Sequence, residues 1–177
     1  MRRGELLALR WRDIDFRSGA LHIRRSVNRI AGHGFVVNEP KTTKGRRTIV
    51  LPSLVLDALN KHRLQQHEVR NRAGTSWQDN DLVFCSRNGN FLYPDYEVQC
   101  FQKLLEKAGL PHMRFHDLRH SAATILLSMG IHPKVVQELL GHSRIQVTMD
   151  IYSHVLPSMS LQEDAMSKLN NLLEGDF

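Results

Sequence analysis

The sequence has few cysteines and no long apolar run, and each absence excludes a class of protein. Cys85 and Cys100 are the two cysteines in 177 residues, and their spacing fits no metal-binding motif or disulfide framework. No apolar run approaches the roughly 18 residues of a membrane-spanning helix, and charged residues interrupt the stretch where a signal peptide would be apolar. We therefore expect a cytoplasmic protein that has no membrane partner.

The sequence also has no internal repeat, no low-complexity segment and no Gly-rich loop of the Walker type. Nothing therefore indicates a repeat protein or a nucleotide cofactor. Hydrophobic residues make up 41% and charged residues 24% of the chain, which is typical of a globular domain with a substantial core.

Basic residues outnumber acidic ones, and their distribution is uneven. The chain carries 24 Lys and Arg against 18 Asp and Glu, a formal net charge of +6, with a pI of about 9.7. The segments "RGELLALRWRD", "HIRRSVNR" and "KTTKGRR" crowd the positive charge into the first 47 residues. Such a balance favours a polyanionic partner, although charge alone is only weak support for nucleic acid.

The first half of the chain predicts two helices and a small sheet. Residues 2–10 indicate a short helix, and "LPSLVLDALNKHRLQQHEVRN" predicts a long one with Pro52 near its start. The segments "SGALHIRRSV", "GFVVNEPKT" and "RRTIVLP" alternate like strands, and we expect them to form one three-stranded antiparallel sheet. A further short strand is expected at "LVFCS", after a loop at "AGTSWQDND".

From about residue 95 the pattern is helical, in five segments separated by Gly, Pro or Ser. The whole chain is therefore expected to be α+β and mostly helical, with a small three-stranded antiparallel sheet packed with a helical core.

The segment "HDLRH" places His116, Arg119 and His120 on one face of a helix. One interpretation is a zinc site, because the two histidines have the i, i+4 spacing of zinc-binding helices. The metalloprotease motif, however, has Glu where Asp117 stands, and a cation at Arg119 opposes bound zinc. We therefore predict no metal. The other interpretation is an ordinary solvated polar face.

Two further chemical groups follow downstream. His142 ends the helical segment at "LLGH", and Tyr152 lies ten residues later in "TMDIYSHV". Two helical segments separate His116 from these residues, so the chain can fold back and bring guanidinium, imidazole and phenol into one pocket.

These motifs, with "MRRGELLALRWRDID" and "PKTTKGRRTIVLP", resemble the catalytic domain of the tyrosine recombinases, the phage integrase family. The resemblance extends from residue 1 to about 157 and has five motifs in the family's order. It implies an integrase-like fold and an enzyme of a phage or mobile element that cleaves and rejoins DNA. By position it implies the catalytic residues Arg2, Lys44, His116, Arg119, His142 and Tyr152, with Glu5 in a supporting role.

The chemistry of phosphodiester cleavage needs these residue types. Negative charge builds up on the phosphoryl oxygens during attack, and two arginines offer permanently charged, forked donors to it. The phenol of Tyr152 has an unperturbed pKa of about 10, so it needs a proton acceptor, for which we expect His116. Lys44 is expected to protonate the leaving 5′-oxygen, and His142 to donate a hydrogen bond to a non-bridging oxygen. Glu5 is expected to orient His116 or Arg2.

Each assignment has a simpler alternative. Lys41 lies three residues from Lys44 and can serve in its place, and Glu5 can simply favour the start of a helix. Tyr152 can be a core aromatic. We expect structural roles for Tyr93 and Tyr96, since the matching motif flanks neither of them. The position of Arg2 near the chain start leaves it open to fraying.

We expect residues 1–157 to form the catalytic domain, without the helices that precede it in the family. Residues 158–177 are expected to form a C-terminal helix, exchanged between protomers of a homotetramer or packed within its own chain. The isolated chain should bind double-stranded DNA weakly and in a salt-sensitive way, with low activity. A type IB topoisomerase-like relaxing activity and a non-catalytic DNA-binding remnant are the alternatives.

Overall fold

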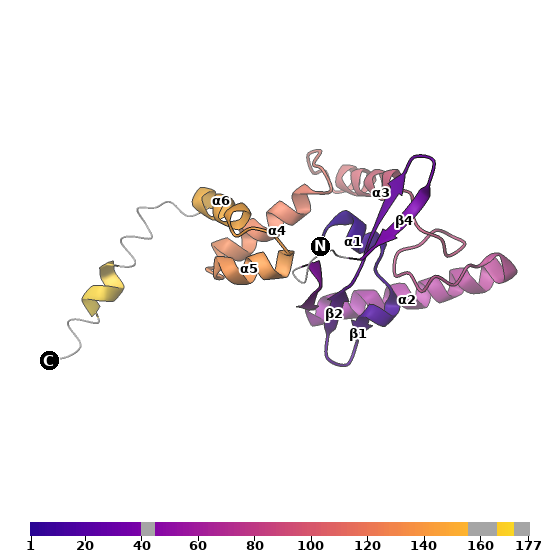
Figure 1. The fold of residues 1–177 in the computed structure, drawn as a ribbon, viewed down its shortest axis with the longest axis horizontal. Helices are drawn as coiled ribbons and strands as arrows, with labels where there is room; N and C mark the ends of the chain where they lie inside the picture. The colour runs from indigo at the N-terminus through magenta and orange to yellow at the C-terminus, as the bar shows by residue number, and fades with distance from the viewer. Residues whose placement is uncertain (40–44, 156–165, 172–177) are drawn as a thin grey trace. The chain divides into compact units, whose positions relative to one another are not determined.

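The computed structural model describes residues 1–39, 45–155 and 166–171. The chain divides into two units at Arg119 and His120, and Figure 1 labels their helices and strands. Each unit contains its own cluster of buried apolar side chains. Within the described residues, no helix combines the length and the apolar character needed to cross a membrane.

The first unit contains a three-stranded antiparallel sheet in the order β1-β2-β5. Its strands are β1 (Ile14–Asp15), β2 (Ala20–Ile23) and β5 (Arg47–Val50), and Leu21 pairs with both Ile14 and Ile49. The turn from β1 to β2 needs a glycine, since Gly19 has a φ of +72°. A three-stranded antiparallel sheet, as expected, is confirmed.

The membership of this sheet differs from the prediction. The segment "GFVVN" forms β4 (Gly34–Asn38), which pairs with β3 (Ser26–Ile30) in a separate two-stranded hairpin. The reason is that "ALHIRRSV" is two strands rather than one, interrupted at Arg24 and Arg25. The third strand of the sheet is the short β1, which the pattern did not reveal.

Three helices complete the first unit: α1 (Arg3–Leu7), α2 (Ser53–Ala73) and α3 (Pro94–Lys107). Helix α1 packs directly on β3. A Cβ on Gly4 would lie 2.7 Å from the carbonyl oxygen of Val27, so this approach requires glycine. Helix α2 covers the three-stranded sheet, and the core there consists of Leu9, Ile14, Leu21, Ile23 and Val83, with Leu56 and Leu59 of α2 packed against it.

Two short predictions in this unit were wrong: the helix expected over residues 2–10 is shorter, and the strand expected at "LVFCS" does not form. Helix α1 ends at Leu7 because the next residues pair with a distant segment: the Leu9 carbonyl accepts the Val83 N–H at 2.9 Å, and Arg10 bridges Leu82. The segment "LVFCS" therefore forms an isolated bridge instead of a strand. The loop at "AGTSWQDND" begins with a 3-10 turn, η3 (Gly74–Ser76).

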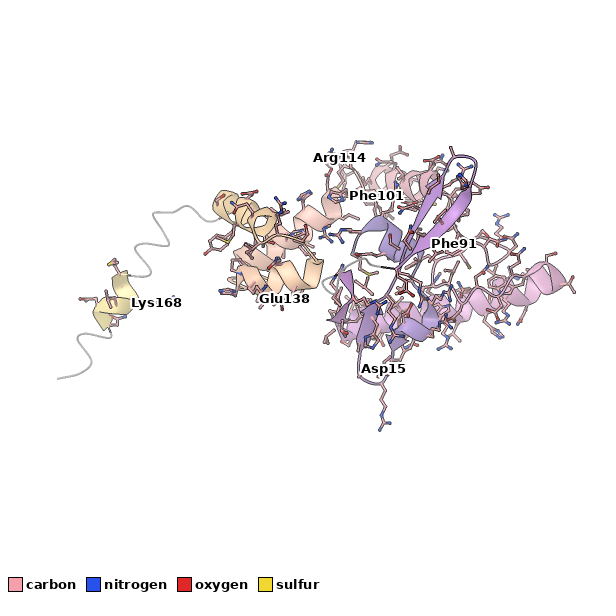
Figure 2. The ribbon with its side chains drawn as sticks, in the orientation of Figure 1. Asp15, Phe91, Phe101, Arg114, Glu138 and Lys168 are labelled. Carbon is pink, nitrogen blue, oxygen red and sulfur yellow. The ribbon has the colours of Figure 1, made fainter. Side chains whose placement is uncertain are left out.

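An aromatic cluster packs against the β3–β4 hairpin. Phe35 of β4 packs against Phe91, which Figure 2 labels, and against Tyr93, with ring centroids 5.4 Å apart in both pairs. This small cluster joins Leu7, Ala8 and Val27, and so ties the hairpin to α1.

Helix α4 (Asp117–Ser128) begins in the first unit and runs into the second, which also contains α5 (Pro133–Leu140) and α6 (Gln146–Val155). Its core is Ala123, Leu127, Val136 and Leu140. The expected helices are confirmed, and residues 166–171 are helical as well. Met166 and Leu169 of the expected C-terminal apolar face are exposed, whereas Leu161, Ala165 and Leu172 lie outside the described residues.

Candidate functional site

The carboxylate of Glu5 organises the basic residues of the first unit. Glu5 is 5% exposed and lies in the first turn of α1. Its Oε2 accepts the Arg2 backbone N–H at 2.7 Å, and its Oε1 accepts Arg2 Nη1 at 3.3 Å. Arg47 donates two further hydrogen bonds, to Oε1 at 3.0 Å and to Oε2 at 2.8 Å. Glu5 therefore caps α1 and also binds a guanidinium from β5.

The electrostatic state of Glu5 follows from these contacts. Burial acts to raise the pKa of Glu5, but the hydrogen bonds from Arg47 and from the Arg2 backbone, with the charges of both arginines, lower the pKa below its ordinary value of 4.5. Glu5 is therefore ionised at neutral pH.

Arg119 is the third arginine near this carboxylate. It is 7% exposed, and its Nη1 is buried with no hydrogen-bond partner among the described residues. Burial first, and then the positive charges of Arg2 and Arg47, lower the pKa of Arg119 to about 10, against the opposing charge of Glu5. Arg119 thus stays charged at neutral pH while it is both buried and repelled.

We call Arg2, Arg47, Arg119 and Glu5 the arginine cluster. Two guanidiniums bind the Glu5 carboxylate, and the charge of Arg119 interacts with all three groups, so the cluster holds excess positive charge in a partly desolvated place. A bound oxyanion would supply the missing negative charge and an acceptor for Arg119 Nη1. A phosphate has both properties.

His116 and Asp117 lie where α4 begins. His116 lies just before the helix and is exposed, and its carbonyl accepts the Arg119 N–H at 3.0 Å. Asp117 binds Arg114, labelled in Figure 2, through the backbone N–H at 2.9 Å and through the guanidinium at 3.1 Å. His120 is exposed. Within the described residues, no group of three or more His, Cys, Asp or Glu side chains gathers as a metal site would require.

His142 and Tyr152 lie in the second unit. Gly141 ends α5 in the left-handed conformation, with φ at 71°, and turns the chain so that His142 is 8% exposed. His142 Nδ1 lies 2.8 Å from the hydroxyl oxygen of the fully buried Thr148, and Gln137 Nε2 donates to the His142 carbonyl at 3.2 Å. The Thr148 contact fixes the orientation of the imidazole ring, and the Gln137 bond holds the backbone that carries it.

Tyr152 lies on α6 and is half-buried. Its ring packs against the core of Ala123, Leu127, Val136 and Leu140. The core of the second unit therefore holds the Tyr152 ring in place. This packing fits both a positioned nucleophile and an ordinary core aromatic. Tyr93 and Tyr96 differ from it, because both are more than half exposed and belong to the first unit.

The structure thus brings Arg2, Glu5 and Arg119 together in the first unit, where His116 also lies, and places His142 and Tyr152 in the second. Lys44 and its alternative Lys41 lie outside the described residues.

Sequence reasoning missed two residues of the site. Arg47 was overlooked because "KGRR" suggests solvated charge. In β5, however, Arg47 lies two residues before the half-buried Ile49, and residues two apart in a strand face the same side, so this spacing indicated that Arg47 faces inward. Thr148 gave no comparable signal, since its contact with His142 depends on how α6 packs on α5.

Replacing Glu5 by glutamine is expected to lower the free energy of unfolding by about 3 kcal/mol, because Arg2 and Arg47 lose the carboxylate that they share and Arg119 loses a compensating charge. The stabilisation by Glu5 is complete above pH 4.5 and is lost as the pH falls through the lowered folded pKa, so the variant should lose this part of its acid sensitivity. Urea denaturation at several pH values measures both effects.

Glu68→Gln is the matched control, since Glu68 is 69% exposed and pairs with Arg72 on the surface of α2. Its unfolding free energy should change by no more than about 0.5 kcal/mol. Equal stability of the Glu5 and Glu68 variants would show that the arginine cluster needs no carboxylate.

Comparison with known proteins identifies relatives along nearly the whole chain. The phage integrase family model matches residues 1–159. A XerC-like tyrosine recombinase of Caldanaerobacter subterraneus subsp. tengcongensis is 35% identical over 184 residues, covering 97% of this chain and 46% of the relative.

Solved structures agree with this assignment. The Tn1549 transposon integrase, in complex with transposon right end DNA, has a TM-score of 0.81 at 24% identity, covering 96% of this chain and 55% of the other. This likeness shows a shared fold. The XerH site-specific recombinase, bound to a palindromic difH substrate after cleavage, has a TM-score of 0.63 at 27% identity, covering 93% of this chain and 41% of that one.

The chain therefore spans about half the length of the relatives that it matches. The resemblance read from the five sequence motifs is confirmed. Because the family match runs through both the arginine cluster and Tyr152, this chain belongs to the phage integrase family, whose enzymes cleave and rejoin DNA.

Proposed function

We propose that this chain carries out site-specific DNA recombination through a phosphotyrosyl intermediate. The observation that carries the proposal is the arginine cluster. Arg119 is buried, repelled by Arg2 and Arg47, and has an Nη1 without a hydrogen-bond partner among the described residues, as expected of a group that binds an oxyanion. The DNA backbone supplies such a group as a phosphodiester.

The proposed reaction is a reversible transesterification. Arg2 and Arg119 bind the non-bridging oxygens of the scissile phosphate, and the Tyr152 oxygen attacks phosphorus. The bond from phosphorus to the 5′-oxygen breaks, which leaves a 3′-phosphotyrosyl bond and a free 5′-hydroxyl. A 5′-hydroxyl from another strand then attacks the same phosphorus and releases Tyr152. The covalent bond conserves the energy of the phosphodiester, so no metal or nucleotide cofactor is needed.

Three residues are assigned to proton transfer and hydrogen bonding. His116 accepts the phenol proton, and Lys44, with Lys41 as its alternative, protonates the leaving 5′-oxygen. His142 donates to a non-bridging oxygen through Nε2, an assignment supported by the contact of its Nδ1 with Thr148. Glu5 holds Arg2 in place, supported by its two hydrogen bonds to that residue.

The proposal extends to the setting of the reaction. Residues 1–157 act as the catalytic domain on double-stranded DNA in the cytoplasm. Four copies assemble on paired sites, and residues 158–177 pass from each protomer to its neighbour. Cross-linking on paired sites that traps nothing larger than a dimer would contradict the tetramer.

The experiment that tests this function is covalent capture without metal. The protein is incubated in EDTA with nicked duplexes whose central sequence is randomised, so that the protein itself selects the sequences it cleaves. The nick lets the short strand beside the cleaved phosphate diffuse away, which traps the intermediate. We expect a protein-DNA adduct that survives denaturation and gathers one sequence class.

Other outcomes would point to other functions. Adducts that form on any sequence, together with relaxation of supercoiled DNA, would identify a topoisomerase-like activity. DNA binding without an adduct on any of the duplexes would identify a non-catalytic DNA-binding protein.

A further inference from the structure

A second buried carboxylate in the first unit also binds arginines. Asp13 is 1% exposed and ends the 3-10 turn η1 (Trp11–Asp13). Its Oδ1 lies 3.5 Å from Arg25 Nη2 and 4.0 Å from Arg24 Nε, and its Oδ2 accepts the Arg10 backbone N–H at 3.2 Å. Asp13 thus resembles Glu5 in its burial and in its several arginine neighbours.

This second group also has donors in excess. Arg25 Nη1 and Arg10 Nε are buried and have no hydrogen-bond partner within the described part of the chain. Burial, and next the charge of Arg25, lower the pKa of the Arg10 guanidinium. One carboxylate therefore does not satisfy the guanidiniums around it.

A cavity of about 550 Å³ opens beside these residues. Four of its eight described lining residues are arginines: Arg24 and Arg25 follow β2, Arg46 directly precedes β5, and Arg47 is the first residue of β5. Glu39 is the one acidic residue among them, and it is engaged in an ion pair with Arg46. The wall of this cavity is therefore strongly basic.

The cavity is built on a rigid base. Its remaining polar lining comes from His22 and Thr48, which face each other across the β2–β5 ladder with His22 Nδ1 2.9 Å from Thr48 Oγ1. The side chains of Arg24 and Arg46 are 56% and 61% exposed. Two long cationic side chains therefore lie at the solvent-facing edge of the cavity, next to the hydrogen-bonded β2–β5 ladder. Such an arrangement suits an extended anion at the surface better than a small enclosed one.

Arg47 connects this cavity with the arginine cluster. Its guanidinium binds Glu5, which also binds Arg2, and the same residue lines the cavity. An anion in the cavity therefore lies beside the site where the scissile phosphate is proposed to bind. A DNA strand provides such neighbouring anions, because every nucleotide carries a phosphate.

We propose that this cavity, lined by Arg24, Arg25 and Arg46, binds a backbone phosphate of the same DNA next to the cleaved position. The inference rests on the proposed function for its choice of DNA as the partner. No bond changes in the cavity, so its residues act as positioning residues. They carry no sequence information and set the register of the strand relative to Arg119.

The test is the salt dependence of DNA binding by the full chain. In Arg24→Gln/Arg46→Gln, the slope of log K against log salt should fall by about 1, with roughly tenfold weaker binding at low salt, since about 0.9 of the slope comes from each phosphate contact. Arg70→Gln/Arg72→Gln on α2 is the matched control. It removes the same charge from arginines that are 50% and 79% exposed and that also pair with surface carboxylates.

A charge-conserving pair separates binding from folding. Arg24→Lys/Arg46→Lys should restore most of the slope, because Lys also neutralises a phosphate as a point charge. An unchanged slope in the Gln pair, or an equal fall in the control pair, would overturn the proposal. A third result would also overturn the proposal. If inorganic pyrophosphate raises the melting temperature of the wild type but not of the Gln pair, while the DNA-binding slope of the Gln pair equals that of the wild type, the ligand of the cavity is a free anion.

The outcome is distinguishable from failure of the proposed function, because DNA binding requires no chemistry. A wild-type slope in the Gln pair with normal adduct formation would refute the cavity assignment alone. If the wild type forms no adduct while the Gln pair shows the expected fall in slope, the proposed recombination is refuted and the cavity remains a DNA-binding site.

Discussion

Tyr152→Phe is expected to abolish the covalent protein-DNA adduct, with a rate at least about 10⁴-fold below wild type, because a phenyl ring has no oxygen to attack phosphorus. The ring packs against the apolar core of the second unit, and phenylalanine keeps this packing. DNA affinity and the urea midpoint should therefore stay close to those of the wild type. Denaturing gels on nicked duplex measure the adduct, and fluorescence anisotropy measures the binding.

Two other substitutions make this prediction specific. Tyr93→Phe and Tyr96→Phe remove hydroxyls that are exposed on the first unit, and both variants should form the adduct at the wild-type rate. An adduct that persists in Tyr152→Phe and disappears in Tyr93→Phe or Tyr96→Phe would show that one of these other tyrosines is the nucleophile.

Arg119→Lys is expected to slow cleavage by about 10² to 10³-fold at saturating DNA. Lysine keeps the charge but cannot present a planar fork to two phosphoryl oxygens. The loss should fall mainly on the rate rather than on affinity, because charge accumulates on these oxygens in the transition state. Single-turnover cleavage over a range of protein concentrations separates the two quantities.

Arg114→Lys is the control for this change. Arg114 lies five residues before Arg119, is 80% exposed and pairs with Asp117. Its replacement should leave cleavage within about twofold, since a surface ion pair contributes little. A wild-type cleavage rate in Arg119→Lys would mean that the arginine cluster does not contact the reacting phosphate.

Local patterns predicted most of the elements, and long-range pairing accounts for the errors. The apolar periodicity of α2 and the Gly and Pro stops after residue 95 lie within short stretches of sequence, so those helices could be predicted. The sheet was harder, because "ALHIRRSV" alternates throughout although its two halves pair with different strands. The end of α1 depends on Leu82 and Val83, which lie more than 70 residues away.

The site shows the same division. Arg119, His142 and Tyr152 could be proposed because their motifs resemble a family, and the choice of Arg2 as a partner of Glu5 was one of two alternatives. The structure places Glu5 against Arg2 and adds Arg47, whose role depends on a contact 42 residues apart in sequence. A pattern of charges cannot show which arginine is buried, since burial depends on how α1 and β5 pack within the first unit.

The measurement that tests the central claim most directly is mass spectrometry of the trapped adduct after digestion with nuclease and trypsin. Trypsin cleaves after Arg144 and Lys168, and the peptide of residues 145–168 contains Tyr152 as its one tyrosine, while Tyr93 and Tyr96 share residues 88–103. We expect the nucleotide mass on the peptide of residues 145–168, attached at Tyr152 through a 3′-phosphate. A nucleotide on residues 88–103, or an adduct joined through a 5′-phosphate, would contradict the account.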